Sequence, residues 1–204
     1  MTRLLPYLLT LSFLPGMTNW VDPPQRPQSR DRTSRSRIAR TQVPWVENAG
    51  QWNDNLLFVA NTFTGNVLIT KDQKIVYALP VDSTSGYVLQ ERFVGKARKR
   101  SAQPCVGEQR EASVSNYFIG NDPARWTTGV ASYEMLTMGE VWEGINVKLK
   151  AYHSNVEKLF YVQPQVDPQQ IQVAVDGAEN LSLSPNGQLL VHTPSGKIAY
   201  SAPV

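Results

Sequence analysis

The sequence predicts an all-β fold, specifically an antiparallel β-sandwich-like domain of two sheets. About a dozen short segments rich in Val, Ile, Leu, Tyr and Phe follow one another along residues 43–204, and several alternate with polar residues at period two. Clusters of turn-forming residues separate them, such as TFTGN, GNDP, SPNG and TPSG. Because no long window carries a helical stripe of apolar residues, many short strands joined by tight turns are the expected architecture.

The β-branched and aromatic content of each segment favours a strand over a helix. The expected strands are, in order, residues 55–62, 66–70, 74–81, 86–94, 113–119, 133–138, 145–152, 157–163, 170–175, 180–184, 188–192 and 197–201. Near the end of the chain, Gly187 and Gly196 are expected to supply the positive φ of two consecutive tight turns. Residues 95–111, with the basic run KARKR, are expected to form one long polar loop.

Three regions are expected along the chain: a signal-peptide-like segment at residues 1–20, a disordered linker at residues 21–42, and the β domain at residues 43–204. The first has one positive charge, an apolar run and small or polar residues after it, which is typical of a secretory signal. Pro6 and Pro15 interrupt this run, and it is too short for a stable membrane span. The linker is rich in Arg, Pro and Ser and cannot bury enough apolar surface to offset the entropy of ordering it.

The positive charge of the chain belongs to its first 42 residues. That part carries seven arginines against two aspartates, a net +5, whereas the other thirteen basic and fifteen acidic residues leave the β domain at −2. The β domain therefore lacks the basic face that nucleic-acid binding requires, and no nucleic-acid partner is expected. The linker arginines are interpreted as a solvated basic segment, with contact to phosphate, anionic lipid or acidic glycan as the alternative.

No catalytic, cofactor-binding or metal-binding constellation is recognised in the sequence. Cys105 is the single cysteine, which excludes an intramolecular disulfide, and its polar surroundings indicate an ordinary loop thiol. His153 and His192 lie in no nucleophile motif. Four glutamates are considered for a carboxylate pair and interpreted as solubilising positions: Glu134, Glu140, Glu143 and Glu157. A weakly bound calcium ion held by turn carboxylates stays open as an alternative.

Residues 116–126, NYFIGNDPARW, raise the question of whether a ligand site or a structural corner lies here. A short apolar strand runs into Gly-Asn-Asp-Pro, which is turn chemistry, and Asp122 before a proline is expected to be extended. We predict a structural corner, with Trp126 folding back to close the end of the core. Its residues are Asn116, Tyr117, Gly120, Asn121, Asp122, Pro123 and Trp126. Trp52 and Trp142 are predicted as further core aromatics.

This stretch does not stand alone. Together with VENAGQWNDNLLFVA (46–60), GEVWEGINVKLKAY (139–152), VEKLFYVQPQVDPQQIQV (156–173) and GAENLSLSPNGQLLVHTPSG (177–196), it resembles a domain of unknown function near the N-terminus of large secreted bacterial proteins. Those proteins continue into β-propeller-type (SBBP) repeats. The resemblance covers nearly all of residues 43–204, in order.

Two motifs match that family pattern well: Asn-x-Gly-Gln-Trp at residues 48–52 and Asn-Tyr-Phe-x-Gly-Asn at residues 116–121. The chain departs from it elsewhere. Asn146 stands where the family has an aspartate, Lys158 and Leu159 replace a Tyr-Asp pair, and residues 164–168 lack the turn glycine. Any ligand that relatives hold through those acidic positions is therefore not expected here.

The resemblance implies an exported, modular protein and no established reaction. We expect a non-catalytic extracellular structural or binding module of a bacterial cell-surface or secreted protein, with downstream propeller-repeat domains or cell-surface components as partners. The alternative is a carbohydrate-binding or carbohydrate-active β-sandwich, which needs tryptophans and tyrosines that face solvent.

Overall fold

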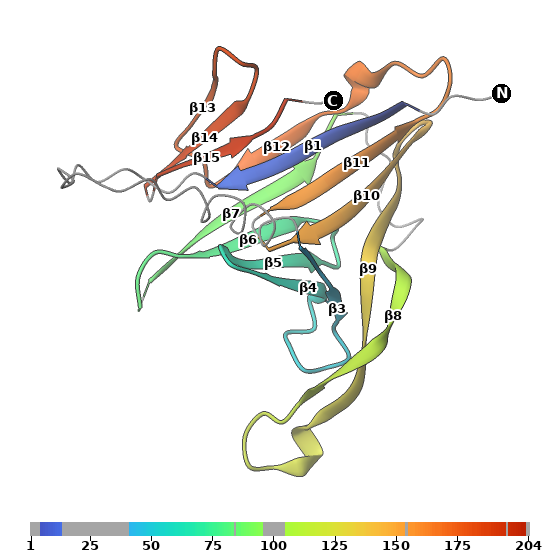
Figure 1. The fold of residues 1–204 in the computed structure, drawn as a ribbon, viewed down its shortest axis with the longest axis vertical. Coiled ribbons are helices and arrows are strands. Elements are labelled where there is room, and N and C mark those ends of the chain that lie inside the picture. Colours follow the sequence, from blue (N-terminus) through green and yellow to red (C-terminus); the bar gives the residue numbers. More distant parts are fainter. Residues whose placement is uncertain are drawn as a thin grey trace, which may run out of the picture.

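The computed structural model describes residues 5–13, of which it gives the backbone, and residues 41–83, 85–95, 105–153, 155–194 and 196–202. Every regular element among these residues is a strand, apart from two single turns of 3₁₀ helix, η1 (Pro123–Arg125) and η2 (Pro168–Gln170). The predicted all-β, antiparallel, two-sheet fold is confirmed (Figure 1).

The larger sheet is antiparallel and runs in the order β12-β7-β6-β5-β4-β3-β9-β10-β11, with β2 paired to β10 and β8 paired to β9. Its strands are β2 (Gln42–Val43), β3 (Trp45–Glu47), β4 (Leu56–Thr62), β5 (Gly65–Thr70), β6 (Ile75–Pro80), β7 (Gly86–Phe93), β8 (Val106–Tyr117), β9 (Thr127–Trp142), β10 (Ile145–Tyr152), β11 (Val156–Val162) and β12 (Val173–Asp176).

The smaller sheet lies at the opposite end of the molecule from the β8–β9 hairpin (Figure 1). It contains β13 (Asn180–Leu183), β14 (Leu189–Thr193) and β15 (Gly196–Tyr200) in sequential antiparallel pairing. Gly187 and Gly196, in the turns before β14 and β15, have φ of 80° and 130°, which confirms the predicted turns. Strand β1 (Leu5–Phe13) pairs with β11 on one side and β15 on the other, and so joins the two sheets.

The core follows from strict alternation in the central strands. Every second residue of β10 and β11 is buried, because side chains of a strand point alternately to its two faces. The two buried faces meet the inward faces of β4 to β7, so one contiguous core contains Trp45, Phe58, Ile69, Tyr77, Leu89, Leu136, Trp142, Val147 and Phe160, among others.

Strand β8 is where sequence reasoning missed the most. Residues 106–111 were expected within a polar loop, but they form the first half of a twelve-residue strand. Its N-terminal half reads VGEQRE and lacks an apolar face because β8 is an outer strand, mostly exposed and paired through its backbone with β9. Two register irregularities with β9, and Gln109 at φ 57°, further hide its periodicity.

The two N-terminal predictions fall mostly outside the described residues. Residues 1–4 and 14–40 are not described, so the secretory signal and the disordered linker stay predictions. The described part of the signal-like segment is β1. The linker was expected to extend to residue 42, but Gln42 already pairs with Tyr152 of β10, so the domain begins slightly earlier than predicted.

A fully buried ion pair lies where the two sheets meet. Lys158 of β11 and Glu91 of β7 are 0% and 1% exposed. The Nζ atom of Lys158 lies 3.0 Å from Oε1 and 2.9 Å from Oε2 of Glu91, with hydrogen-bond geometry to Oε1, while Oε2 accepts no hydrogen bond. The pair therefore joins two strands that are distant in the sheet order, across the core.

Two tyrosines complete this cluster. Tyr200 of β15 donates a hydrogen bond of 2.6 Å to Oε1 of Glu91, and its ring centroid lies 4.9 Å from Nζ of Lys158. The hydroxyl of Tyr77 in β6 lies 3.4 Å from the same Nζ. Burial, reinforced by the charge of Glu91, raises the pKa of both tyrosines well above its usual value, so both hydroxyls stay neutral.

We predict that breaking this pair destabilises the domain severely. Lys158→Met leaves the carboxylate of Glu91 buried without its cation, which typically costs about 3–5 kcal/mol, whereas the double variant Lys158→Met with Glu91→Leu removes both charges and should be more stable than the single variant. Urea unfolding followed by circular dichroism measures the difference.

The matched control is Arg92→Met on the same strand. Arg92 pairs with Asp176 at 2.5 Å on the surface, where solvent screens the charges, so its loss should change the unfolding midpoint little. Equal effects of Lys158→Met and Arg92→Met would show that the buried pair does not hold the sheets together.

Candidate functional site

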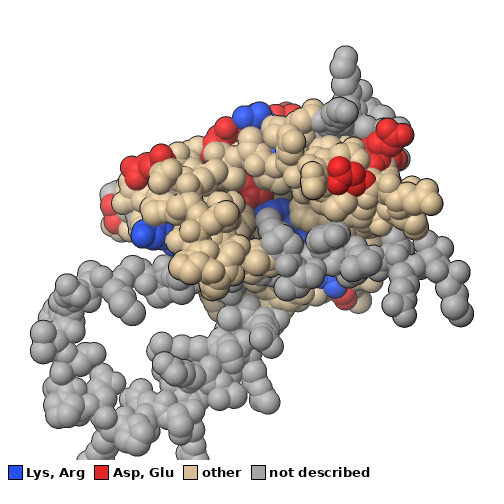
Figure 2. All heavy atoms as spheres, turned by 90° about the horizontal axis from the view of Figure 1, so that it is seen from above, with Lys and Arg blue, Asp and Glu red and all other residues tan. Residues whose placement is uncertain are grey.

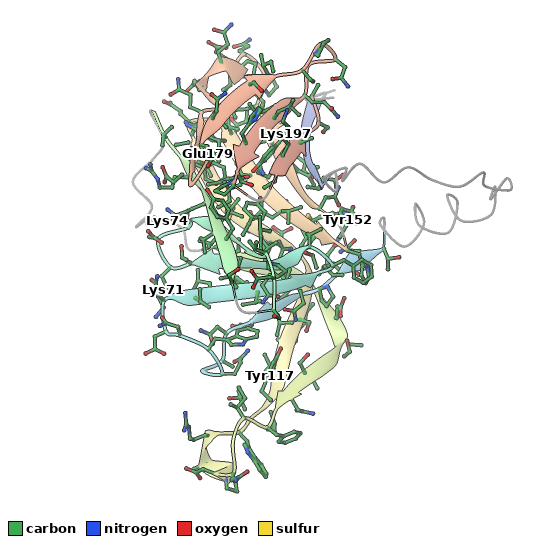
Figure 3. All side chains as sticks on the ribbon, turned by 90° about the vertical axis from the view of Figure 1, so that its left-hand side faces the viewer. Lys71, Lys74, Tyr117, Tyr152, Glu179 and Lys197 are labelled. Carbon is green, nitrogen blue, oxygen red and sulfur yellow. The ribbon has the colours of Figure 1, made fainter. Side chains whose placement is uncertain are left out.

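The β8–β9 hairpin carries the most prominent surface feature of the molecule, a projecting arm of residues 114–131. The arm extends away from the rest of the larger sheet, and the turn at its far end, residues 118–126, forms the arm tip (Figure 1). In Figure 3, Tyr117 lies on the arm, whereas Glu179 and Lys197 lie at the opposite end of the molecule. The arm therefore presents residues 116–126 far from the core.

The local geometry of the arm tip is the predicted turn. Gly120 has φ 76°, and Asp122 is extended before Pro123, as a residue before proline should be. The carboxylate of Asp122 accepts a hydrogen bond of 3.0 Å from the backbone N–H of Ala124 and so caps the single turn η1. The turn chemistry seen in the sequence thus produces the turn.

The prediction that Trp126 closes the core is wrong. Trp126 is 41% exposed, and the same turn carries two further exposed apolar residues, Phe118 at 62% and Ile119 at 48%. The Trp126 ring meets Phe118 edge to face at 5.2 Å, and its Nε1 donates a hydrogen bond of 3.1 Å to the carbonyl of Gly120. The ring does fold back, but onto its own turn, because the long hairpin carries the turn beyond the reach of the core.

The base of the arm is braced from two sides. Asn116 accepts a hydrogen bond of 2.9 Å from the backbone N–H of Gly129 through its Oδ1, which ties the two strands of the arm together. Tyr117 packs edge to face against Trp52 at 5.2 Å, and burial raises the pKa of Tyr117. The two motifs of residues 48–52 and 116–121 therefore meet in space.

Trp52 lies on a loop whose shape Asn48 sets. The Oδ1 of Asn48 accepts hydrogen bonds of 3.2 Å from the N–H groups of Gly50 and Trp52, and its Nδ2 donates to the carbonyls of Asn53 and Leu56. Trp52 was predicted to belong to the core; it is half-buried and braces the arm instead. The loop thus holds the direction of the arm relative to the sheet.

Trp142 confirms the other core prediction. It is fully buried at the end of β9, meets Phe93 edge to face at 5.3 Å, and donates a hydrogen bond of 3.0 Å from Nε1 to the carbonyl of Val94. The polar edge of the indole is therefore satisfied inside the core. Trp142 at the end of β9 is therefore buried, whereas Trp126, just before the start of the same strand, is exposed.

The arm tip exposes a group of apolar side chains. Its exposed surface combines two aromatic rings and one aliphatic side chain, and Asp122 is occupied by the turn. The contact between the two rings and the hydrogen bond from Trp126 to Gly120 already hold these side chains, which lowers the side-chain entropy that would be lost on binding. Figure 2 views the opposite end of the molecule, where the described side chains are mostly uncharged and charges of both signs are scattered.

The ionisable residues considered in the sequence are not assembled into a catalytic site. The Nε2 of His192 lies 2.8 Å from Oγ of Ser182 on the neighbouring strand, but no carboxylate of the described residues bonds to its other ring nitrogen, which a triad requires. His153 contacts the carbonyl of Thr41 and the ring of Phe63.

The glutamates have separate local surroundings. Glu140 caps the β9–β10 turn through the N–H of Gly144, Glu157 accepts from the hydroxyl of Tyr152, and Glu134 and Glu143 are exposed. The buried Lys158–Glu91 pair is closed to substrate, since solvent does not reach its side chains.

No metal site is assembled within the described part of the chain. It contains no group of three or more His, Cys, Asp or Glu residues able to hold an ion together. The two Asp-Pro turns use their carboxylates locally: Asp122 accepts from Ala124 and Asp167 accepts from Gln169 at 2.9 Å. Over the same described ranges, the chain has no helix with the length and apolar character of a membrane span.

Cys105 directly precedes β8 and lies outside any strand, as expected, but its side chain belongs to the core, at 4% exposed, which was not predicted. Most of the residues around it in sequence are polar, so nothing in the local sequence indicates that this side chain is buried. Burial raises the pKa of the Cys105 thiol to about 12, which keeps the thiolate, the reactive form, scarce.

Comparison with known families gives one match. A family described as "Domain of unknown function (DUF7948)" matches residues 45–204, which includes the arm, the Trp52 loop and the buried cluster. No curated protein and no solved structure matches the chain.

We predict effects of very different size for the two tryptophans of this region. Trp142→Ala should lower the free energy of unfolding by about 3–5 kcal/mol, because it removes a buried aromatic side chain. Trp126→Ala should change it by less than about 1 kcal/mol, since the ring contacts only its own turn. Thermal unfolding of both variants measures the difference. A large loss of stability with Trp126→Ala would show that the Trp126 ring packs against the core after all.

A second prediction concerns Cys105. In the folded protein at neutral pH, a maleimide probe should leave this thiol unlabelled, and labelling should become complete in denaturing guanidinium chloride. Mass spectrometry counts the label. Rapid labelling of the folded chain would mean that the start of β8 is open to solvent.

Proposed function

The chain belongs to the DUF7948 family of domains of unknown function, and we propose that it is a non-catalytic structural and binding module whose projecting arm docks onto another protein. The observation that carries the proposal is the arm tip. Phe118, Ile119 and Trp126 are all exposed on one turn at the end of a braced hairpin, where Phe118 and Trp126 contact each other and none of the three belongs to the core.

Exposed apolar groups of this kind favour a protein surface with an apolar pocket as the partner. Hot spots of protein interfaces are enriched in tryptophan and other large side chains that insert into such pockets. The arm supplies reach, and the Trp52–Tyr117 contact supplies a fixed direction, so the tip approaches its partner already oriented. Grouped exposed apolar residues of a monomer mark interaction sites more often than isolated ones.

A non-catalytic role is supported by what surrounds each reactive group. His192 has a serine partner without an orienting acid, Cys105 is buried, and the single buried ion pair described holds two strands together. Each of these groups has a structural explanation.

We propose further that the module is exported and belongs to a bacterial secreted or cell-surface protein. The signal-like composition of residues 1–20 supports export. The resemblance to the N-terminal domains of SBBP-type repeat proteins supports a modular setting, in which propeller repeats or cell-surface components offer the partner surface for the arm.

Carbohydrate binding is the second candidate, and the exposure of Trp126 and Phe118 is the observation that favours it. Sugar-binding modules stack aromatic faces on pyranose rings. Here the two rings meet edge to face, and the tip projects outward, which fits a pocket on the partner better than a sugar held in a groove.

The test compares binding of the purified chain to cell-envelope fractions of a bacterium that carries the gene. The double variant Phe118→Ser with Trp126→Ser should bind at least about tenfold more weakly, because loss of one central aromatic hot spot costs about 2 kcal/mol or more. Its unfolding midpoint should stay close to that of the wild type.

The matched control is Val88→Ser with Leu183→Ser, two exposed apolar residues outside the arm, which should bind as the wild type does. Equal binding by both double variants would contradict docking through the arm. Binding that survives protease treatment of the envelope and is competed by its purified polysaccharide would favour the carbohydrate alternative.

A further inference from the structure

Strand β1 occupies a position that two different sheets share. Residues Leu5 to Thr10 pair antiparallel with β11, from Leu5↔Val162 to Thr10↔Glu157, and residues Leu11 to Phe13 pair antiparallel with β15. Without β1, the larger sheet ends at β11 and the smaller sheet ends at β15. The two sheets therefore face each other across a gap one strand wide, here called the strand slot (Figure 1).

The strand that fills this slot comes from outside the family domain. The family match covers residues 45–204, which includes β11 and β15 but not β1. The domain thus contains both walls of the slot and leaves the middle to a separate segment.

The walls of the slot contain the buried cluster. In the register of the sheets, Leu9 lies opposite Lys158 on β11, and Leu11 lies opposite Tyr200 on β15. An empty slot would leave backbone N–H and C=O groups of both walls unpaired, directly beside a buried ion pair, and both are costly. The slot is therefore a position that needs an occupant.

The walls of the slot also determine which side-chain pattern a bound strand needs. Residues directly opposite each other in an antiparallel pair share a face of the sheet, and Lys158, Phe160 and Val162 face the core. An incoming strand therefore needs apolar residues at three alternate positions, which in this chain are the positions of Leu9, Tyr7 and Leu5. The remaining contacts are backbone hydrogen bonds, which any extended peptide can make.

We propose that the strand slot between β11 and β15 is a binding site for an extended, apolar strand of another polypeptide, which replaces β1 when the signal-like N-terminal segment is removed. The replacement rests on the proposed export, because a signal peptide is cleaved from the mature protein. Strand addition of this kind links protein modules through main-chain pairing, with alternate side chains giving specificity.

The first experiment tests the register with the full chain. The double variant Leu8→Cys with Leu159→Cys places two cysteines directly opposite each other on the face away from the core, and mild oxidation should join them. The matched control, Leu8→Cys with Glu157→Cys, shifts the second cysteine by two residues and should not be joined efficiently. Absence of the first disulfide, or equal yield in both, would overturn the slot.

The second experiment tests binding in trans. β1 already contains Pro6, and in the full chain with Tyr7→Pro and Leu9→Pro two further prolines remove two more backbone donors, which should prevent β1 from pairing. A labelled synthetic peptide of residues 5–13 should bind this variant saturably, and at least about tenfold more weakly to the wild type, whose slot is already filled. The same peptide with aspartate at the positions of Leu5, Tyr7 and Leu9 should not bind.

A third measurement covers the case in which the proline variant does not fold. The full chain with Leu159→Cys alone keeps β1 intact, so a peptide of residues 5–13 with cysteine in place of Leu8, added in large excess, must compete with β1 for the slot and should slowly form a disulfide with the cysteine introduced at position 159. The same cysteine-containing peptide with aspartate at the positions of Leu5, Tyr7 and Leu9 should form far less of this disulfide. If the intramolecular disulfide forms but neither trans experiment gives binding, the slot holds β1 only and the proposal is wrong. Arm-tip variants should bind the peptide normally, which separates this result from failure of the proposed docking function.

Discussion

The buried pair of Lys158 and Glu91 is the interaction on which the rest of this structure depends. It joins β11 to β7 across the core, and through Tyr200 it also fixes the smaller sheet to the larger one. Apolar packing alone tolerates sliding of one sheet over another, whereas a buried charge is stable in one alignment only, where its partner lies. We infer that the pair specifies how the sheets are stacked as much as it stabilises them.

Because the core is complete without the β8–β9 arm tip, the tip is free to serve another purpose. Trp142 and Trp126 lie at the two ends of the same hairpin strand region, and one is enclosed while the other meets solvent. The Trp52–Tyr117 contact marks the boundary between the two environments. The arm tip adds nothing to the core, yet it keeps two aromatic rings in a defined turn. We therefore interpret it as a recognition element and not as one needed for folding.

The strand slot, like the arm, is a feature that we propose serves binding to another polypeptide. The sheets need a strand between β11 and β15 to satisfy their backbone groups, yet the family domain does not contain it. A domain of this kind is completed by its surroundings, first by its own N-terminal segment and, in our proposal, later by a neighbour. The arm and the slot lie toward opposite ends of the domain (Figure 1), which suits a module placed between two partners.

Local chemistry in the sequence determined the all-β class, most strand positions, the glycine turns, and the capped Asp-Pro turn at residues 120–126, because alternation, turn residues and capping act over a few residues. Only the tertiary structure decided that the first half of β8, residues 106–111, is a strand, since an exposed edge pairs through its backbone and needs no apolar pattern. It likewise decided that Cys105, Lys158 and Glu91 are buried and that Trp126 is not. Burial depends on which strands come to lie opposite one another, and that contact between residues distant in the chain leaves no trace in their immediate neighbours.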